Sequence, residues 1–212
     1  NYNGPVPVVS YQMTDGFSGE TSTLTLSVTA VNDAPTANPD AGSTPEDQPL
    51  LGNVLVNDAD IDGDALQVTQ FSFNGISYIV GQTATIGGVG SFTMAANGDY
   101  VFTPAANFNG AVPVIGYTVT DGTATASSAL TLTVTAVNDA PVNTLPAGWT
   151  TAEDQRVGLT GLQVSDVDAG ATGPMRITLS VSAGTLTALS GAGVLITGSG
   201  RGTLVLEGSQ GG

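Results

Sequence analysis

Four aspartates at alternate positions form the densest group of chemically active side chains in this sequence. They lie in the segment NDADIDGD, as Asp58, Asp60, Asp62 and Asp64. Two unit charges 4 Å apart repel by about 4 kcal/mol at an effective dielectric constant near 20, so crowded carboxylates favour a cation between them. The order from Asp58 to Gly63 matches the start of a D-x-D-x-D-G calcium loop. The segment therefore predicts a Ca²⁺ site, and the alternative is a solvated acidic turn without metal.

This loop does not match an EF-hand. The twelfth position of an EF-hand loop is a glutamate, and helices flank it. Here the twelfth position is Thr69, and the surrounding sequence has no helical pattern. If part of the segment is extended, its period of two would place all four carboxylates on one side of the strand.

Two further acidic pairs precede aspartate groups at a similar interval. Glu46-Asp47 lies about a dozen residues before the first loop, and Glu153-Asp154 precedes Asp166 and Asp168 in the same way. We interpret the recurrence as a shared site, although a polar loop at a domain entrance also explains each pair alone. The later copy has only Asp166 and Asp168 and lacks the later two of the four aspartates, so we expect a weaker site there or one that holds fewer ions.

The third acidic element is a repeated linker, VNDAP, which carries Asn32 and Asp33 in one copy and Asn138 and Asp139 in the other. Proline favours an extended residue before it and cannot donate to a β-ladder, so a strand ends here and the chain enters the next domain stretched. We hypothesise that Asn32 and Asp33 share an ion with Glu46 and the Asp58 loop. Calcium would then lock the angle between successive domains, and its removal would loosen the junction.

Four other aspartates lie in turn sequences. Asp15 and Asp121 each stand in a T-D-G turn near a domain end, where they are either further ligands or ordinary turn residues. Asp40 and Asp99 are expected to be solvated turn residues.

The chain is a tandem array. The interval from Asn32 to Asn138 is 106 residues, and SVTAVNDAP and TVTAVNDAP recur on this register. A period of this size is that of a β-sandwich domain. We therefore predict the C-terminal part of one repeat at residues 1–33, a complete repeat at 34–139 and the N-terminal part of a divergent repeat at 140–212.

The composition and turns predict an all-β fold. Valine, isoleucine, leucine and threonine alternate with small polar residues, and strand-like runs cover 66–73, 76–80, 100–103, 112–120 and 130–137. The turn pairs Asn74-Gly75, Asn97-Gly98, Asn109-Gly110 and Asp121-Gly122 recur at hairpin spacing. The expected architecture is tandem antiparallel Greek-key β-sandwich domains of cadherin-like or immunoglobulin-like type, joined by short calcium-binding linkers.

The charge and residue types exclude several functions. Three arginines stand against 18 acidic residues, giving a net charge of −15, so nucleic acids and anionic membranes would repel the chain. The absence of histidine and cysteine excludes a Ser-His-Asp triad, a cysteine nucleophile and a histidine-ligated zinc site. We predict no enzymatic activity. A calcium-dependent carbohydrate-binding module stays open, with Trp149 as the one aromatic outside the strand pattern.

The two partial repeats allow two interpretations. In one, this sequence is a window cut from a longer array of repeats. In the other, the tail of one molecule is completed by the head of the next through strand exchange, which would build an extracellular fibre or a surface layer. The expected partners are therefore neighbouring repeats of the same chain or identical molecules, with no nucleic acid and no insertion into membranes.

The phrases VNDAP, EDQPL, NDADIDGD, GDYVFTPAANFNG and YTVTDG resemble the bacterial cadherin-like and immunoglobulin-like tandem repeats of giant RTX-type surface adhesins, including VCBS-like repeats. The resemblance implies a secreted extender stiffened by calcium, which serves cell adhesion or biofilm formation on the surface of a Gram-negative bacterium after type I secretion. It also implies ligand roles for positions matching the cadherin motifs, which are Asn32, Asp33, Glu46, Asp58 and Asp60.

Overall fold

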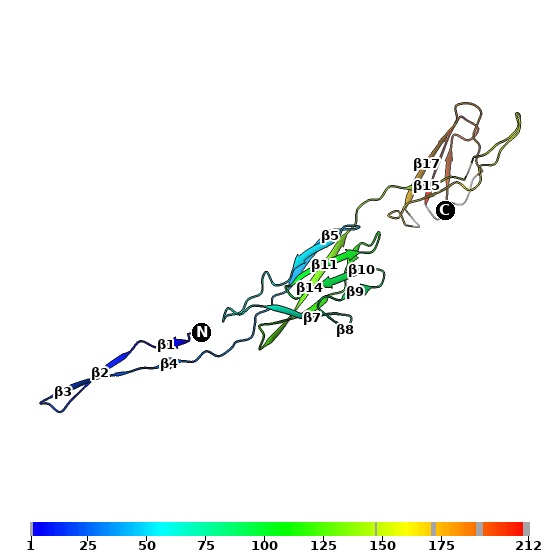
Figure 1. Cartoon of the computed structure of the whole chain (residues 1–212). Coiled ribbons are helices and arrows are strands. Elements are labelled where there is room, and N and C mark those ends of the chain that lie inside the picture. Colours follow the sequence, from blue (N-terminus) through cyan, green and yellow to red (C-terminus); the bar gives the residue numbers. More distant parts are fainter. Residues whose placement is uncertain (1, 147, 171–172, 190–192, 210–212) are drawn as a thin grey trace. The chain divides into compact units, whose positions relative to one another are not determined.

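The computed structural model describes residues 2–146, 148–170, 173–189 and 193–209, and every regular element in these ranges is a β-strand (Figure 1). The chain divides into two compact units, residues 1–136 and 137–212. The first unit contains an N-terminal hairpin and a complete domain. This all-β architecture confirms the predicted fold class.

The complete domain consists of two β-sheets. One sheet holds, in spatial order, β6 (Leu50–Asn53), β11 (Asp99–Pro104), β10 (Gly90–Met94) and β9 (Thr83–Ile86). The other holds β12 (Gly110–Ala111), β14 (Thr125–Thr135), β13 (Ile115–Thr120), β7 (Gln67–Phe73) and β8 (Ile76–Ile79), with β5 (Asp40–Pro45) beside β14.

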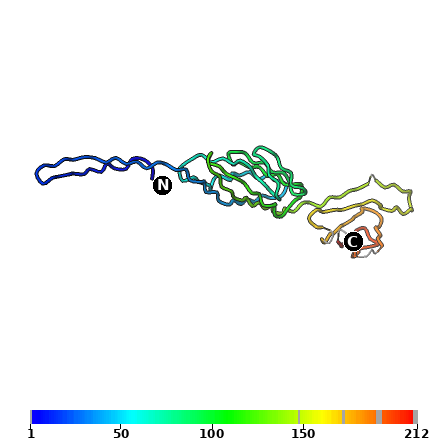
Figure 2. Tube along the Cα trace, turned by 90° about the horizontal axis from the view of Figure 1, so that it is seen from below, coloured from blue at the N-terminus to red at the C-terminus, as the bar shows by residue number. Residues whose placement is uncertain are grey.

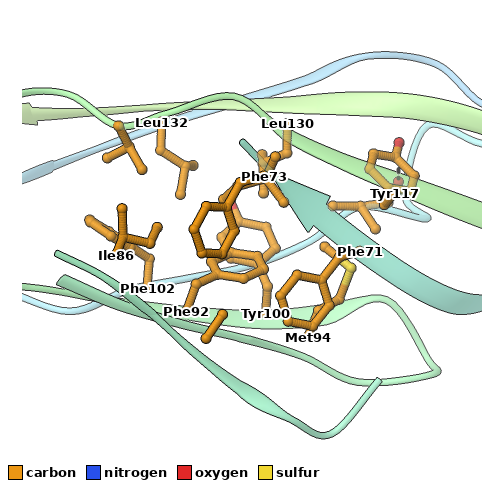
Figure 3. Packing of buried hydrophobic residues seen from close by; sticks show 14 of the residues in the cluster. Phe71, Phe73, Ile86, Phe92, Met94, Tyr100, Phe102, Tyr117, Leu130 and Leu132 are labelled. Carbon is orange, nitrogen blue, oxygen red and sulfur yellow. Dashed lines mark hydrogen bonds between the residues drawn. The ribbon is translucent and has the colours of Figure 1, made fainter. Parts of the chain in front are cut away.

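Aromatic side chains from both sheets fill the space between them (Figure 3). Phe71 of β7 meets Phe92 of β10 edge to face, with ring centroids 5.3 Å apart. Phe92 in turn stacks on Tyr100 of β11 at 5.8 Å. Alternate residues of β11 and β13 are buried, which is the period-two pattern of strands with one face toward a core. Phe71, Phe73, Tyr100, Phe102 and Tyr117, which fall in the strand-like runs of the sequence, are all buried in this core.

One strand pair departs from the predicted antiparallel pattern. β5 pairs with β14 in parallel, with Asp40 opposite Leu130 and Pro45 opposite Thr135. The first and last strands of the domain therefore run in the same direction. As a result the chain enters the domain at one end, by Asp40, and leaves it at the other, after Thr135. We call these the entry end and the exit end.

The N-terminal hairpin repeats the last strands of the domain. Its strands are β1 (Gly4–Pro5), β2 (Val9–Thr14), β3 (Gly19–Leu24) and β4 (Ser27–Val28), and the trace shows its two arms side by side (Figure 2). Tyr11 pairs with Ser22 as Tyr117 pairs with Ser128, and Gly4 pairs with Val28 as Gly110 pairs with Val134. The 106-residue register found in the sequence is thus also the register of strand pairing.

The second unit is smaller and more open. It contains β15 (Val142–Thr144) paired with β16 (Gln163–Ser165), and a three-stranded sheet in the order β17 (Pro174–Ser180), β19 (Thr203–Ser209), β18 (Leu195–Thr197). The pairing of Val142 with Ser165 repeats the bridge between Thr36 and Ala59 of the first unit. The assignment of residues 1–33, 34–139 and 140–212 to separate repeats stays a prediction.

Candidate functional site

The first acidic loop lies at the entry end and is tied to the linker before it. The Asp33 amide donates to Asp62 Oδ2 at 2.7 Å. Two hydrogen bonds of the Thr36–Ala59 bridge, at 2.8 and 3.1 Å, hold the next part of the linker against the same loop. Linker and loop, which the sequence separates by some 25 residues, are therefore one structural element.

Asp60 organises the loop. Its Oδ1 accepts the Asp62 amide at 2.8 Å and lies 3.5 Å from the Asp64 amide, which is an Asx-type turn. Gly63 has a φ of +85°, a left-handed conformation that glycine adopts without strain, as the calcium-loop pattern required. The second oxygen, Oδ2, is buried and has no hydrogen-bond partner among the described residues. A buried carboxylate oxygen without a donor is costly and fits a cation ligand.

Asp58 lies deeper at the same end. Its Oδ1 accepts the Asn38 amide at 2.7 Å, and its Oδ2 is buried without a hydrogen bond in the described part of the chain. Burial raises the pKa of Asp58, and the nearby Asp40 charge raises it further. The backbone hydrogen bond and the neighbouring Tyr117 hydroxyl moderate that rise in pKa.

Tyr117 connects Asp40 to the linker. Its hydroxyl lies 2.7 Å from Asp40 Oδ2 and 2.8 Å from the Asn38 carbonyl oxygen, both of which are acceptors. Burial raises the pKa of Asp40, and the hydrogen bond from Tyr117 partly offsets this. The expectation that Asp40 is a solvated turn residue is therefore wrong, because strand β5 carries it to the rim of the core.

Asp121 completes the group at the entry end. Its Oδ2 accepts the Asn32 side-chain amide at 2.9 Å, and its Oδ1 accepts the amides of Thr123 and Ala124 at 2.6 Å each. The Asn32 amide and these backbone donors lower the pKa of Asp121. The structure thus brings together Asn32, Asp33, Asp58, Asp60, Asp62 and Asp121 at one end of the domain.

Asp15 caps the equivalent turn of the hairpin, where the amides of Ser18 and Phe17 lower its pKa.

The second unit repeats the link between linker and loop. The Asp139 amide donates to Asp168 Oδ2, and the Asp168 amide donates to Asp166 Oδ1 at 2.9 Å. These contacts reproduce those of Asp33, Asp62 and Asp60 on the 106-residue register. The Asn138 side chain bonds the Asp139 carbonyl at 2.8 Å, as Asn32 does with Asp33.

This equivalence corrects the sequence comparison of the two loops. Asp166 and Asp168 are the counterparts of Asp60 and Asp62. The aspartates without a counterpart in the second unit are therefore Asp58 and Asp64, and not the last two of the four.

Glu46 and Asp47 lie at the opposite end of the domain from the Asp58 loop. The Glu46 amide donates to the Thr135 carbonyl at 2.9 Å, which fixes it at the exit end. Its side chain is 4% exposed, and Oε2 accepts the Asn109 side-chain amide at 3.4 Å. Strand β6 lies between Glu46 and Asp58 in the sequence, and Glu46 contacts Thr135 at the exit end whereas Asp58 contacts Asn38 at the entry end. The hypothesis that Glu46 shares one ion with Asp33 and Asp58 of the same repeat is therefore wrong.

Glu153 and Asp154 have the same backbone conformation as their predicted counterparts but a different environment. Asp154 has a φ of +58° and Asp47 a φ of +59°, so the E-D turn is repeated. Asp47 Oδ1 accepts the Asn107 amide at 3.0 Å, whereas Glu153 and Asp154 are both exposed.

The acidic side chains do not converge on a single point. In the described ranges no group of three or more Asp or Glu side chains is placed closely enough to hold a metal ion. Asp33, Asp60 and Asp62 instead form hydrogen bonds within the linker and the loop.

The sequence analysis did not identify Asn38 or the hydroxyl of Tyr117 as parts of the entry end. The signal for Asn38 was its position between the linker proline and Asp40.

Together the two-sheet fold, the parallel first and last strands and the acidic entry end define an immunoglobulin-like β-sandwich repeat. Residues 32–136 match the family model of the bacterial cadherin-like domain, so this repeat is a domain of that type. No curated protein shows a significant match to the sequence.

Several solved structures are similar in fold. A titin Z1Z2 structure in complex with telethonin has a TM-score of 0.38 and 15% identity over 85% of this chain and 83% of that chain. A chimeric titin Z1Z2 carrying a decorin peptide has a TM-score of 0.30 and 17% identity, and 60% of each chain is covered. An endo-fucoidan hydrolase of glycoside hydrolase family 107 has a TM-score of 0.32 and 16% identity, and the match spans 95% of this chain but 29% of that one.

Bacterial cadherin-like domains are typically extracellular structural domains, and residues 32–136 match this type of domain. The described residues include no helix with the length and apolar character needed to cross a membrane.

Proposed function

We propose that this chain is an extender segment of a secreted bacterial surface adhesin, in which calcium bound at the entry end of a repeat fixes the linker to that repeat. Such a segment would hold a distal binding region away from the cell and support adhesion or biofilm formation. The resemblance to RTX-type and VCBS-like repeats supports type I secretion by a Gram-negative bacterium as part of this proposal.

The observation that carries the proposal is the pair of buried carboxylate oxygens without donors, Asp58 Oδ2 and Asp60 Oδ2, beside the linker. Calcium accepts six to eight oxygen ligands in flexible geometry, and carboxylates, amide oxygens and backbone carbonyls all qualify. The candidate ligands are Asp33, Asp58, Asp60, Asp62 and Asp121, with the side-chain oxygen of Asn32. Because no three of the described acidic side chains lie close enough to hold a metal ion, binding would require these side chains to move together. A bound ion would neutralise these carboxylates, which the hydrogen bonds from backbone amides stabilise only in part.

The parallel arrangement of β5 and β14 supports an extender role. The chain enters and leaves at opposite ends of the domain, and the six residues of β5 alone span roughly 17 Å at about 3.4 Å per residue. Repeats connected in this way add length with every copy. The repetition of the linker contact at Asp139 and Asp168 supports the same role for the second unit.

The test is calcium titration of the chain followed by thermal unfolding. We expect binding in the range of about 0.1–1 mM, which is typical of extracellular modules. At a calcium concentration 100 times the dissociation constant, one site stabilises the folded state by about 2.7 kcal/mol. The melting temperature should therefore rise when EDTA is replaced by calcium.

The variant Asp60→Asn separates ion binding from folding. Asparagine keeps an Oδ1 acceptor for the Asp62 amide but removes the negative charge, so the turn should survive while calcium affinity falls. The matched control is Glu20→Gln, which removes one charge from the exposed strand β3. A calcium response that Asp60→Asn leaves unchanged would rule out this site.

A further inference from the structure

Strand β8 is an edge of the six-stranded sheet in the complete domain, because in the described ranges it pairs with β7 alone. Phe73 and Ile76 are the hydrogen-bonded pair that closes the two-residue turn Asn74-Gly75. Hydrogen-bonded and non-bonded pairs alternate along an antiparallel ladder, so the backbone groups of Ser77 and Ile79 point away from β7. Such outward groups are the ones to which a further strand can bond.

Gln82 covers half of this edge. The Ile79 amide donates to Gln82 Oε1 at 3.1 Å, and the Gln82 amide donates to the Ile79 carbonyl oxygen at 3.2 Å. One residue of the turn after β8 therefore occupies both backbone groups of Ile79. Gln82 is exposed, so core packing does not hold its side chain in place. Both hydrogen bonds must break before another strand can pair with Ile79.

Two other edge strands of the same sheet carry features that hinder pairing. β5 begins with Asp40 and ends with Pro45, and β12 is followed closely by Pro113. A charge or a proline on an edge discourages the addition of a strand, and proline has no amide to donate. β8 has neither, and no bulge interrupts its pairing with β7. At β8 the contact with Gln82 takes the place of these features.

The side of the domain that carries β8 has no charge. Between Asp64 and Asp99 the sequence contains no charged residue, and β7, β8, β9 and β10 all lie in this interval. Ile76 and Ile79 are 55% and 64% exposed. Identical copies with a net charge of −15 repel each other least where their facing surfaces are uncharged. Two copies can therefore approach most closely on this side.

β8 is complementary to a second copy of itself. In an antiparallel pair centred on Tyr78, Ser77 of each copy lies opposite Ile79 of the other, and their outward amides and carbonyls meet. The same register places Ile76 opposite Val80, and both lie on the face of the strand that carries Tyr78. The pairing needs the backbone groups of Ile79, which are the groups that Gln82 occupies.

We propose that β8 is a pairing edge for a second copy of this chain and that Gln82 keeps the edge closed in the free protein. When Gln82 releases Ile79, the β8 strands of two copies join their sheets into one. The contact is two-fold symmetric, so it closes at a dimer. It uses neither the entry end nor calcium, and it is therefore independent of the proposed function.

The first experiment is sedimentation of the full chain in EDTA and about 0.15 M salt, with the wild type compared with Gln82→Ala. Alanine removes the acceptor for the Ile79 amide, so a larger fraction of the chains has an open edge. The dissociation constant of the dimer should fall at least about tenfold. Gln82→Ser also lacks an acceptor that reaches Ile79, and it should give the same result.

Gln82→Glu is the matched control. Glutamate keeps an acceptor oxygen at the same reach and adds a charge to the uncharged side, so this variant should dimerise no more than the wild type. Residue 82 is exposed in a turn, so the melting temperatures of all four chains should agree within a few degrees. Thermal unfolding of the same samples checks this.

Cysteine cross-linking tests the register, and the sequence contains no cysteine of its own. Residues of a hydrogen-bonded antiparallel pair have Cα atoms about 5.5 Å apart, which a disulfide can span. In the Gln82→Ala background, a mixture of Ser77→Cys and Ile79→Cys chains should form a disulfide-linked dimer. A mixture of Ser77→Cys and Thr83→Cys chains should not, because Thr83 belongs to β9.

Two results would overturn the proposal. Equal association of the wild type, Gln82→Ala and Gln82→Ser would show that Gln82 does not control the contact. Stronger association of the alanine variant without the disulfide between positions 77 and 79 would show that another surface is responsible.

Discussion

Tyr117 and Tyr11 occupy the same position in two copies of one repeat, yet only the first is part of a closed core. The Tyr117 ring is buried, and its hydroxyl bonds Asp40 Oδ2 and the Asn38 carbonyl. Tyr11 is half exposed on the hairpin. A single hydroxyl therefore holds the start of β5 and the linker against the sandwich in the domain, and the exposed Tyr11 has no comparable role.

Replacing Tyr117 with phenylalanine should destabilise the domain by about 1–3 kcal/mol, because two buried acceptors lose their donor while the ring is kept. Tyr11→Phe is the matched control, and its effect should stay within about 0.5 kcal/mol. Urea denaturation of both variants in EDTA measures the two values. Equal effects in the two variants would contradict a special role for the Tyr117 hydroxyl.

The buried aspartates at the entry end predict how stability changes with pH. Burial raises the pKa of Asp40 and Asp58 above the ordinary value of 3.8. The folded state therefore binds these protons more tightly than the unfolded chain, and ionisation of the two carboxyls costs stability. In EDTA the melting temperature should rise as the pH falls from neutral toward the raised pKa values of these two carboxyls, since protonation relieves that cost.

Asp121 acts in the opposite direction, but over a lower range of pH. Its pKa is lowered below 3.8, so the stability it contributes is lost only as the pH falls through that lower region. Asp40→Asn removes one of the two carboxyls with a raised pKa and should flatten this rise in melting temperature. Thermal unfolding at a series of pH values measures both slopes, and an unchanged slope in this variant would contradict the assignment.

At the scale of elements, strands β5 and β6 depend on glycines where the ring of Tyr100 lies across them. A Cβ atom at Gly52 would lie 2.5 Å from Cζ and 2.7 Å from Cε1 of Tyr100. At Gly42 the nearest atoms would be Leu50 Cδ2 at 3.0 Å and the Tyr100 hydroxyl at 3.1 Å. The close approach of these strands to the core thus requires small residues.

Gly52→Ala should cost about 1–3 kcal/mol of unfolding free energy, because the added methyl group overpacks a buried ring. Gly87→Ala is the control, since nothing lies within 4 Å of a Cβ at that position. The control should be neutral or slightly stabilising, as alanine restricts the unfolded chain. Chemical denaturation compares the two, and a neutral Gly52→Ala would show that β6 moves aside without cost.

The sequence predicted most elements because the repeats and turns leave local signals. The run 66–73 corresponds to β7 (Gln67–Phe73) and 76–80 to β8 (Ile76–Ile79), and the turn between them has the positive φ values of Asn74 and Gly75. The parallel pairing of β5 with β14 left no such signal. The paired residues of β5 and β14 are some 90 positions apart in the sequence. A period-two pattern shows which side chains share a face but not the direction of the neighbouring strand.

The candidate site was predicted as a set of residues but not as an arrangement. The linker and the Asp58 loop do meet, as Asp33 and Asp62 show. Glu46 was placed with them because about a dozen residues separate it from Asp58. That interval contains strand β6, which returns the chain to the other end of the domain, so proximity in sequence was misleading.

At the scale of the whole molecule, the net charge of −15 opposes any ordered arrangement of successive repeats, and the acidic residues gather at the linkers. The contacts between Asp33 and Asp62, and between Asp139 and Asp168, tie each linker to the repeat that follows it. The first linker is also held by the Asn32–Asp121 contact and by the Thr36–Ala59 bridge. A hydrogen bond contributes about 0.5–1.5 kcal/mol, and none of these contacts supplies the full positive charge that would neutralise the gathered carboxylates.

Calcium should therefore change the stiffness of the chain more than it changes the fold of a repeat. Small-angle scattering of the chain should show a longer maximum dimension in calcium than in EDTA. The double variant Asp60→Asn with Asp166→Asn should give the EDTA profile under both conditions, because both linkers would lack an ion. Circular dichroism should be unchanged throughout, since the candidate ligands lie in linkers and loops outside the strands. A scattering profile that is the same in calcium and EDTA, together with proven calcium binding, would mean that the ion stabilises single repeats and that stiffness has another source.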